Sequence, residues 1–117
     1  MTTILHISSR ADWLSAQPTG NYEADSLSSQ GFIHCSRPDQ VLGVVNSNNP
    51  FEGQNELLLL CIDPDQVVAE IRYENLEGGD NLFPHIYGPL NLDSVTDVLE
   101  FVRDNNGVFT LPQELLG

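Results

Sequence analysis

The segment Gly31-Phe32-Ile33-His34-Cys35-Ser36 places a histidine between apolar residues and ends in a serine. Its apolar and β-branched content predicts a short strand, in which alternate side chains point to opposite faces. Ser36 and Asp39 stand three residues apart, which is the spacing of a helix-capping box, and Pro38 suits the first turn of a helix. The segment therefore predicts a strand that leads into a helix, whose apolar side chains are Val41, Leu42, Val44 and Val45.

The same arrangement occurs at the start of the chain. Residues 3–8 alternate and contain His6, so they predict a first strand. Ser9 and Asp12 again have capping-box spacing, and they precede a short apolar helix that Pro18-Thr19-Gly20 ends. The chain thus repeats a unit of strand, histidine, serine cap and helix.

Three further strands are expected. The unbroken apolar run 57–62 suits a strand that is covered on both faces, at the centre of a sheet. Residues 67–74 alternate, with Glu70, Arg72 and Glu74 on one side, which predicts a half-exposed strand. Residues 96–102 fit a helix or a strand, and Asn106-Gly107 followed by an apolar segment favours a β-hairpin.

The 117 residues are 40% hydrophobic, which is enough for one core and one domain over residues 1–117. The fold class expected from the order of these elements is α+β. We expect a mixed sheet that is strongly curved or split, with two short helices after the histidine strands.

The charge balance is strongly acidic. Four arginines and no lysine stand against 17 acidic residues, for a formal net charge of −13. Binding to nucleic acid or to an anionic membrane requires cations along a surface, so neither is an expected partner. Mutual repulsion of this size favours a monomer, and the composition would also suit a high-salt medium.

No stretch approaches 18 apolar residues, and the N-terminus lacks the basic start and long apolar run of a signal peptide. The expected localisation is therefore cytoplasmic. Cys35 and Cys61 each lie within an apolar run, so we expect them to be reduced and buried, without a disulfide.

The candidate chemistry lies in the three histidines His6, His34 and His85, each of which is flanked by apolar residues. If the neighbouring aliphatic side chains fill the core, strand alternation directs the histidines toward one surface or cleft. Under the alternative hypothesis each imidazole is simply hydrogen-bonded near the core, because histidine is often partly buried.

Arg10 and Arg37 lie in the first turns of the two predicted helices. A cation there opposes the positive end of the helix dipole, and a bound anion would resolve that conflict. The alternative is that each arginine pairs with a carboxylate such as Asp12 or Asp39. Both alternatives stay open at this level.

A metal site and a cysteine nucleophile are both disfavoured by the sequence. The three histidines are far apart in the chain and form no short metal-ligand motif, so no metal is expected. Cys35 shares a strand face with Ile33, and this position is typical of packing rather than of a reactive thiolate.

The blocks Leu5-His6-Ile7-Ser8, residues 31–36 and Phe83-Pro84-His85-Ile86-Tyr87-Gly88-Pro89-Leu90 resemble the bacterial domain of unknown function 952 family over nearly the whole chain. That family looks like a compact member of the ADP-ribosyltransferase superfamily, in the branch that resembles RNA 2′-phosphotransferases. The resemblance implies an ADP-ribosyltransferase-like fold and NAD as a substrate, with His6 and His34 in the first and second motifs.

The resemblance also implies roles for individual residues. His6 would position the ribose, while His34 and Tyr87 would shape the nicotinamide side. His85 would hydrogen-bond ribose or act as an acid or base. Phosphate contacts would come from Arg10 or Arg37, and Ser8 and Ser36 are further candidate ligand-binding residues. The glutamate motif of protein-modifying transferases is missing from residues 83–87, and the acidic charge disfavours phosphorylated RNA.

The function expected from these observations is binding or cleavage of NAD or a related phosphorylated nucleoside in a cleft lined by histidines. One alternative is a non-enzymatic module that binds a ligand or a protein on the same fold. Another is a purely structural role for the three histidines.

Overall fold

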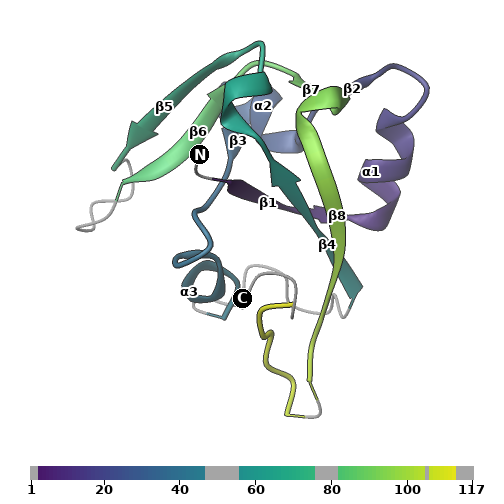
Figure 1. Cartoon of the computed structure of the whole chain (residues 1–117), viewed down its shortest axis with the longest axis vertical. Helices are drawn as coiled ribbons and strands as arrows, with labels where there is room; N and C mark the ends of the chain where they lie inside the picture. Colours follow the sequence, from purple (N-terminus) through teal and green to yellow (C-terminus); the bar gives the residue numbers. More distant parts are fainter. Residues whose placement is uncertain (1–2, 47–55, 76–81, 105, 113–117) are drawn as a thin grey trace.

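The apolar run 57–62 lies at the centre of a three-stranded antiparallel sheet. The computed structural model describes residues 3–46, 56–75, 82–104 and 106–112. The strands of this sheet are β1 (Ile4–Ser9), β4 (Glu56–Ile62) and β8 (Val95–Val102), in the order β1-β4-β8 (Figure 1). Every residue from Leu57 to Ile62 is buried. The expectation of a central strand covered on both faces is confirmed.

Two smaller sheets complete the β-structure of the described residues. One contains β3 (Ile33–His34), β6 (Phe83–Tyr87) and β5 (Glu70–Glu74), in the order β3-β6-β5. The other pairs β2 (Asn21–Tyr22) with β7 (Leu90–Asn91). The β-structure is therefore split, as one of the expected arrangements required.

The expectation of a mixed sheet was wrong, because every strand pairing among the described residues is antiparallel. The repeated strand-helix unit favoured parallel neighbours, which need a helical crossover between them. The structure instead places β1 and β3 in different sheets, so the helix after β1 joins no pair of parallel strands.

The described residues contain three α-helices, where two were expected. They are α1 (Arg10–Ala16), α2 (Asp25–Gln30) and α3 (Val41–Asn46), and single 3-10 turns occur at η1 (Pro64–Gln66) and η2 (Leu92–Ser94). The capping of α1 is confirmed, because the Asp12 amide donates to Ser9 Oγ at 3.1 Å. Helix α2 escaped prediction because its six mainly polar residues give no apolar periodicity, and no side chain caps it.

The predicted capping box of α3 was wrong. Ser36 forms a β-bridge with Leu5 through two backbone hydrogen bonds, so it belongs to the β-structure and not to a helix start. The helix begins five residues later, at Val41. The turn before it is closed by Gln40, whose side-chain oxygen accepts from the Arg37 amide at 3.0 Å. The Gln40 side chain thus closes the turn that leads into α3.

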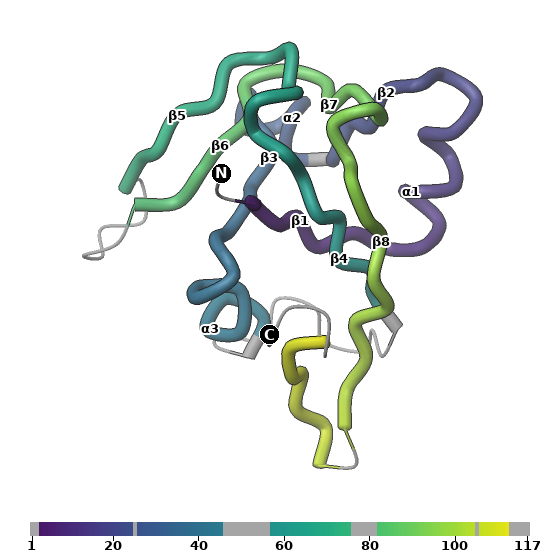
Figure 2. Tube along the Cα trace, in the orientation of Figure 1, coloured from purple at the N-terminus to yellow at the C-terminus, as the bar shows by residue number. Residues whose placement is uncertain are grey.

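Two hydrophobic clusters lie on opposite faces of the β1-β4-β8 sheet. The first includes Ile4, Leu60, Ile33 and Ile86, and it joins this sheet to the β3-β6-β5 sheet. The second includes Leu5, Leu59, Val41, Val45, Phe101 and Phe109, and it packs α3 and the C-terminal segment against the other face (Figure 2). Alternate residues of β1 and β4 therefore enter different clusters.

The strand predicted near the C-terminus is confirmed as β8, but in the part of the hairpin that the structure describes the pairing is a single bridge. It joins Arg103 and Phe109, around a turn in which Gly107 has a φ of +78°. The segment is held by its rings, because Phe109 packs 4.8 Å from Phe101, centroid to centroid, and Arg103 lies over the Phe109 ring.

The Cα radius of gyration is 13.5 Å, close to the roughly 13 Å typical of a compact domain of this length. No helix among the described ranges is long and apolar enough to cross a membrane.

Candidate functional site

His34 and His85 face each other across the antiparallel pair β3 and β6. Their ring centroids are 5.4 Å apart, in an edge-on arrangement. The neighbouring residues Ile33 and Ile86 point the other way, into the first hydrophobic cluster. Because only one face of this sheet packs on the core, alternation directs the two histidines to the opposite face, as the sequence predicted.

Phe32 and Tyr87 complete a group of four rings with these histidines, which we call the aromatic face. Phe32 stacks on His85 with a centroid distance of 4.3 Å and an interplanar angle of 27°. The same ring meets His34 at 4.8 Å and Tyr87 at 5.2 Å. Phe32 follows Gly31, whose φ of +89° ends α2 in the left-handed conformation that glycine adopts readily.

A carboxylate lies at the side of the aromatic face. Glu74 Oε1 is 3.0 Å from His85 Nδ1 and accepts a hydrogen bond of 2.5 Å from the Tyr87 hydroxyl. These two bonds lower the pKa of Glu74, and the bond from Tyr87 has the larger effect. The same bond to Glu74, together with burial, raises the pKa of Tyr87. Glu74 is therefore an ionised carboxylate at neutral pH.

The tautomer of His85 follows from its partner. A carboxylate can only accept hydrogen bonds, so the proton that points toward Glu74 belongs to His85 Nδ1. In the neutral ring Nε2 then carries a lone pair. The His85 side chain is fully buried, and Nε2 has no hydrogen-bond partner among the described residues. A buried polar atom without a partner is rare in folded proteins, so this nitrogen needs an explanation.

Arg72 is the cation next to the aromatic face. Its guanidinium lies 4.4 Å from the centre of the Tyr87 ring, in a cation–π contact, and it makes two hydrogen bonds with Glu70, at 3.0 and 3.1 Å. The side chain is half exposed. Arg72 can therefore reach a bound anion while it stays in contact with the aromatic face.

His6 lies in the interior, not on the aromatic face. Its Nδ1 donates to the main-chain carbonyl of His34 at 2.6 Å, and its Nε2 lies 3.0 Å from the Tyr22 hydroxyl. That hydroxyl is also 3.0 Å from Ser8 Oγ. Burial lowers the pKa of His6 to about 4, against the opposing effect of the bond to the His34 carbonyl. His6 is thus a neutral, hydrogen-bonded interior side chain at neutral pH.

The structure brings His34, His85 and Tyr87 together on the aromatic face, and it brings His6 and Ser36 to His34 at a separate place. A small, mostly apolar hollow is lined by His6 and His34, together with Leu5, Ile7, Ser36 and Val44. His85 is not among its lining residues. Ser8 and Ser36 are both buried.

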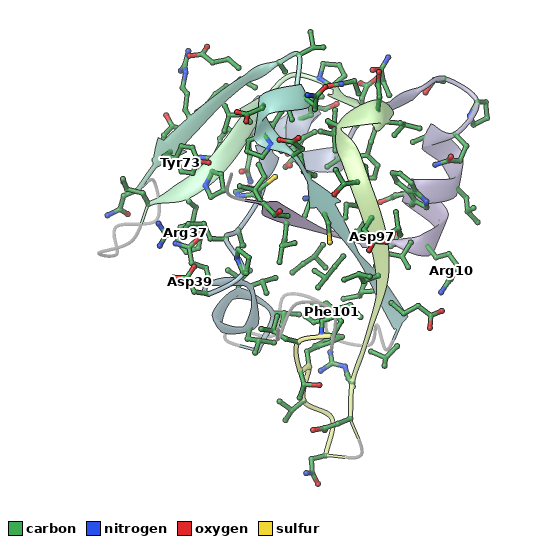
Figure 3. The ribbon with its side chains drawn as sticks, viewed as in Figure 1. Arg10, Arg37, Asp39, Tyr73, Asp97 and Phe101 are labelled. Atoms are coloured by element: carbon green, nitrogen blue, oxygen red, sulfur yellow. The ribbon has the colours of Figure 1, made fainter. Side chains whose placement is uncertain are left out.

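Arg10 and Arg37 lie on different sides of the molecule (Figure 3). Arg10 pairs with Glu100 at 3.1 Å, and Arg37 pairs with Asp39 at 3.3 Å. The alternative in which each arginine pairs with a carboxylate therefore holds in this structure, and the two cations cannot both serve one small ligand.

Burial raises the pKa of the Cys35 thiol far above its usual range, which disfavours a thiolate nucleophile. Within the described ranges, no group of three or more His, Cys, Asp or Glu residues is arranged to hold a metal ion.

Glu74, Phe32 and Arg72 are the site residues that sequence reasoning missed. The alternation of residues 67–74 places Glu74 on the polar face of its strand, but it does not reveal which strand lies beside it. The pairing of β5 with β6 brings Glu74 toward His85 and Tyr87. The signal available in the sequence was the shared face of Glu70, Arg72 and Glu74.

The fold and the site define a small α+β domain with three antiparallel sheets and a buried histidine held by a carboxylate. A family model described as "Protein of unknown function (DUF952)" matches residues 7–98, and the chain belongs to this family.

Solved structures of the protein CC0527 from Caulobacter crescentus are similar to this chain at 33% sequence identity. The crystal structure has a TM-score of 0.84 and covers 97% of this chain and 98% of that chain. The solution NMR structure has a TM-score of 0.82 and covers 99% and 98%. No curated protein matches the chain.

Proposed function

We propose that the protein binds NAD or a related phosphorylated nucleoside at the aromatic face and cleaves the bond between the ribose and its base. The observation that carries the proposal is the position of Glu74, whose carboxylate is held by Tyr87 and His85. The resemblance to ADP-ribosyltransferases, in fold and in chemistry, is part of the proposal.

Cleavage of an N-ribosyl bond passes through a transition state in which positive charge develops on the sugar, as in glycoside hydrolysis. A fixed anion beside that charge stabilises the transition state more than the ground state. Glu74 meets this requirement, because its lowered pKa keeps it ionised and its two hydrogen bonds hold it in place. It supplies the carboxylate that the motif at residues 83–87 lacks.

The surrounding residues fit the remaining parts of such a ligand. Phe32 and Tyr87 offer ring surfaces for a flat base, and His34 is a partly exposed hydrogen-bonding group beside them. Arg72 is the described arginine that contacts the aromatic face, so it takes the phosphate-binding role expected of Arg10 or Arg37.

A binding module without turnover is the second candidate. The observation that favours it is the complete burial of His85 beneath Phe32, which closes the reactive nitrogen to a ligand in this conformation. Such a module would use the outer rings of the aromatic face and leave Glu74 and His85 as structural supports.

Calorimetric titration with NAD and ADP-ribose, combined with an assay for released nicotinamide, separates the two candidates. Glu74→Gln should lower nicotinamide release by about 100-fold, as the loss of a group that stabilises transition-state charge does, and leave NAD affinity nearly unchanged. Glu23→Gln, at an exposed glutamate before α2, is the matched control and should behave like the wild type.

Binding without nicotinamide release would support the module. Absence of binding at millimolar NAD and ADP-ribose would contradict both candidates. Measurable nicotinamide release at equal rates by Glu74→Gln and Glu23→Gln would contradict the role of Glu74 in cleavage.

A further inference from the structure

His85 Nε2 is the one buried side-chain polar atom without a hydrogen-bond partner among the described residues. The ring is fully buried, so bulk solvent does not reach this nitrogen. A protein that keeps such an atom forgoes a hydrogen bond at that position. The arrangement makes sense if the partner of Nε2 arrives with a ligand.

The other ring nitrogen of His85, Nδ1, makes the kind of hydrogen bond that supports a general base. Glu74 accepts the Nδ1 proton at 3.0 Å, which fixes both the tautomer and the orientation of the imidazole. A carboxylate in this position also stabilises the imidazolium that forms when Nε2 takes up a proton. Tyr87 holds Glu74 from the next strand, so the carboxylate itself is oriented.

Phe32 is the side chain that lies flat on His85, 4.3 Å away. It stands between the left-handed Gly31 and the first residue of β3, outside the β-ladder. Phe32 is itself buried, so His85 becomes accessible only in a minor side-chain state in which the Phe32 ring has turned about χ1, a rotation that breaks no backbone hydrogen bond. In that state a flat ligand ring would take the place of the Phe32 ring in the stack.

We infer that Glu74 and His85 form a general-base pair covered by Phe32, and that His85 Nε2 takes the proton of the hydroxyl group that attacks the ribose. This inference rests on the proposed function for the identity of the substrate.

The proposed reaction balances with water as the attacking group. The bond from the ribose C1′ to the nicotinamide nitrogen breaks, and its electron pair leaves with neutral nicotinamide. The water oxygen forms the new bond to C1′, and its proton passes to His85 Nε2. The resulting imidazolium, paired with Glu74, later releases the proton to solvent.

The titratable and charged groups around His85 are His34 on β3, Arg72 and Glu74 on β5, and Tyr87 on β6. Glu74 is the member of this group that accepts a hydrogen bond from the His85 ring, so it orients the base.

The state of His85 can be measured without any ligand. Long-range proton–nitrogen NMR of the wild-type protein should show a protonated Nδ1 and an unprotonated Nε2 on His85 at neutral pH. The opposite tautomer would overturn the inference, because Nε2 would then have no lone pair to offer.

The covering of His85 by the Phe32 ring can be tested by acylation with diethyl pyrocarbonate. Mass spectrometry then locates the modified residue. In the wild-type protein, the reagent reaches His85 only in a minor state in which the Phe32 ring has moved away, and such states are populated at about 0.1–10%. Phe32→Ala makes His85 accessible all the time, so it should accelerate modification of His85 by at least about tenfold. Adding Glu74→Gln to Phe32→Ala should slow it again. Phe32→Leu serves if circular dichroism shows that Phe32→Ala is unfolded. Equal His85 reactivity with and without the Phe32 ring would refute the cover.

Turnover then separates this inference from the proposed function. His85→Gln should lower nicotinamide release by about 100-fold while NAD still binds. Normal release by His85→Gln would overturn the general base and leave the proposed function intact. A wild-type protein that does not bind NAD overturns the proposed function, and the NMR and acylation results still decide whether a covered base exists.

Discussion

His6 Nδ1 donates a 2.6 Å hydrogen bond to the main-chain carbonyl of His34. The first histidine thus holds the backbone of the second, and it does so from the interior between two sheets. His34 can then present its own ring to the aromatic face. The two histidines, which look equivalent in the sequence, have different tasks in the structure.

Replacement of His6 should therefore act on stability. His6→Ala removes a buried ring and leaves the His34 carbonyl and the Tyr22 hydroxyl without this partner, so it should lower the free energy of unfolding by about 2–4 kcal/mol. Urea denaturation followed by circular dichroism measures the change. His34→Ala, at a partly exposed ring, is the control and should cost less than about 1.5 kcal/mol. A His6→Ala protein as stable as the wild type would contradict the interior role.

The stability should also depend on pH through His6. Its pKa is about 4 in the folded protein and 6.5 in the unfolded chain, so between these values the unfolded state binds the additional proton. The contribution is fully present above pH 6.5 and is lost as the pH falls toward 4. The expected loss is about 3 kcal/mol over this window. His6→Gln should show a shallower decline than the wild type when urea unfolding is repeated across the range.

Salt should strengthen ligand binding. The net charge of −13 repels anionic nucleotides over long distances, and salt screens that repulsion. Raising NaCl from about 20 mM to about 200 mM should tighten ADP-ribose binding by about two- to fivefold, with a smaller effect on NAD, which carries less negative charge. Affinity that weakens with salt would indicate that local cations dominate the interaction.

Arg72 should recognise the phosphates. Arg72→Gln removes the cation beside Tyr87 and should weaken ADP-ribose binding by about tenfold, the size typical of a lost charged hydrogen bond. Nicotinamide riboside, which has no phosphate, is the comparison ligand, and its binding should change little. Arg10→Gln, on α1 and paired with Glu100, is the control for the loss of a charge. Equal effects of Arg72→Gln on both ligands would refute a phosphate contact.

Gly31 should be intolerant of side chains even though the space around it is open. Its φ of +89° is strained for any residue with a Cβ, while no atom of the described residues, its two chain neighbours aside, lies within 4 Å of the place a Cβ would take. Gly31→Ala should thus cost about 1–2 kcal/mol through backbone strain alone. Gly43→Ala, in the open and helical setting of α3, is the matched control and should be neutral or stabilising in thermal unfolding.

The strands were predictable where periodicity is strong. The apolar run 57–62 predicted β4, and the alternation of residues 67–74 predicted β5, which begins three residues later than expected, at Glu70. Helix α2 and the two-residue strand β2 left no such pattern, because six mainly polar residues or two extended ones are too few to show a period. Their positions follow from tertiary contacts.

The sequence by itself determined that Leu5 and Ile7, like Ile33 and Ile86, enter apolar packing, since aliphatic residues beside a histidine in a strand must find a core. Tertiary structure alone decided where each histidine goes. The β3-β6-β5 sheet packs on one face, so alternation sends His34 and His85 outward from the core. The β1-β4-β8 sheet packs on both faces, so the same alternation sends His6 into the interior between this sheet and the β3-β6-β5 sheet. Pairing of β5 with β6 likewise brought Glu74 to His85, because strand order depends on contacts between distant segments that no local pattern encodes.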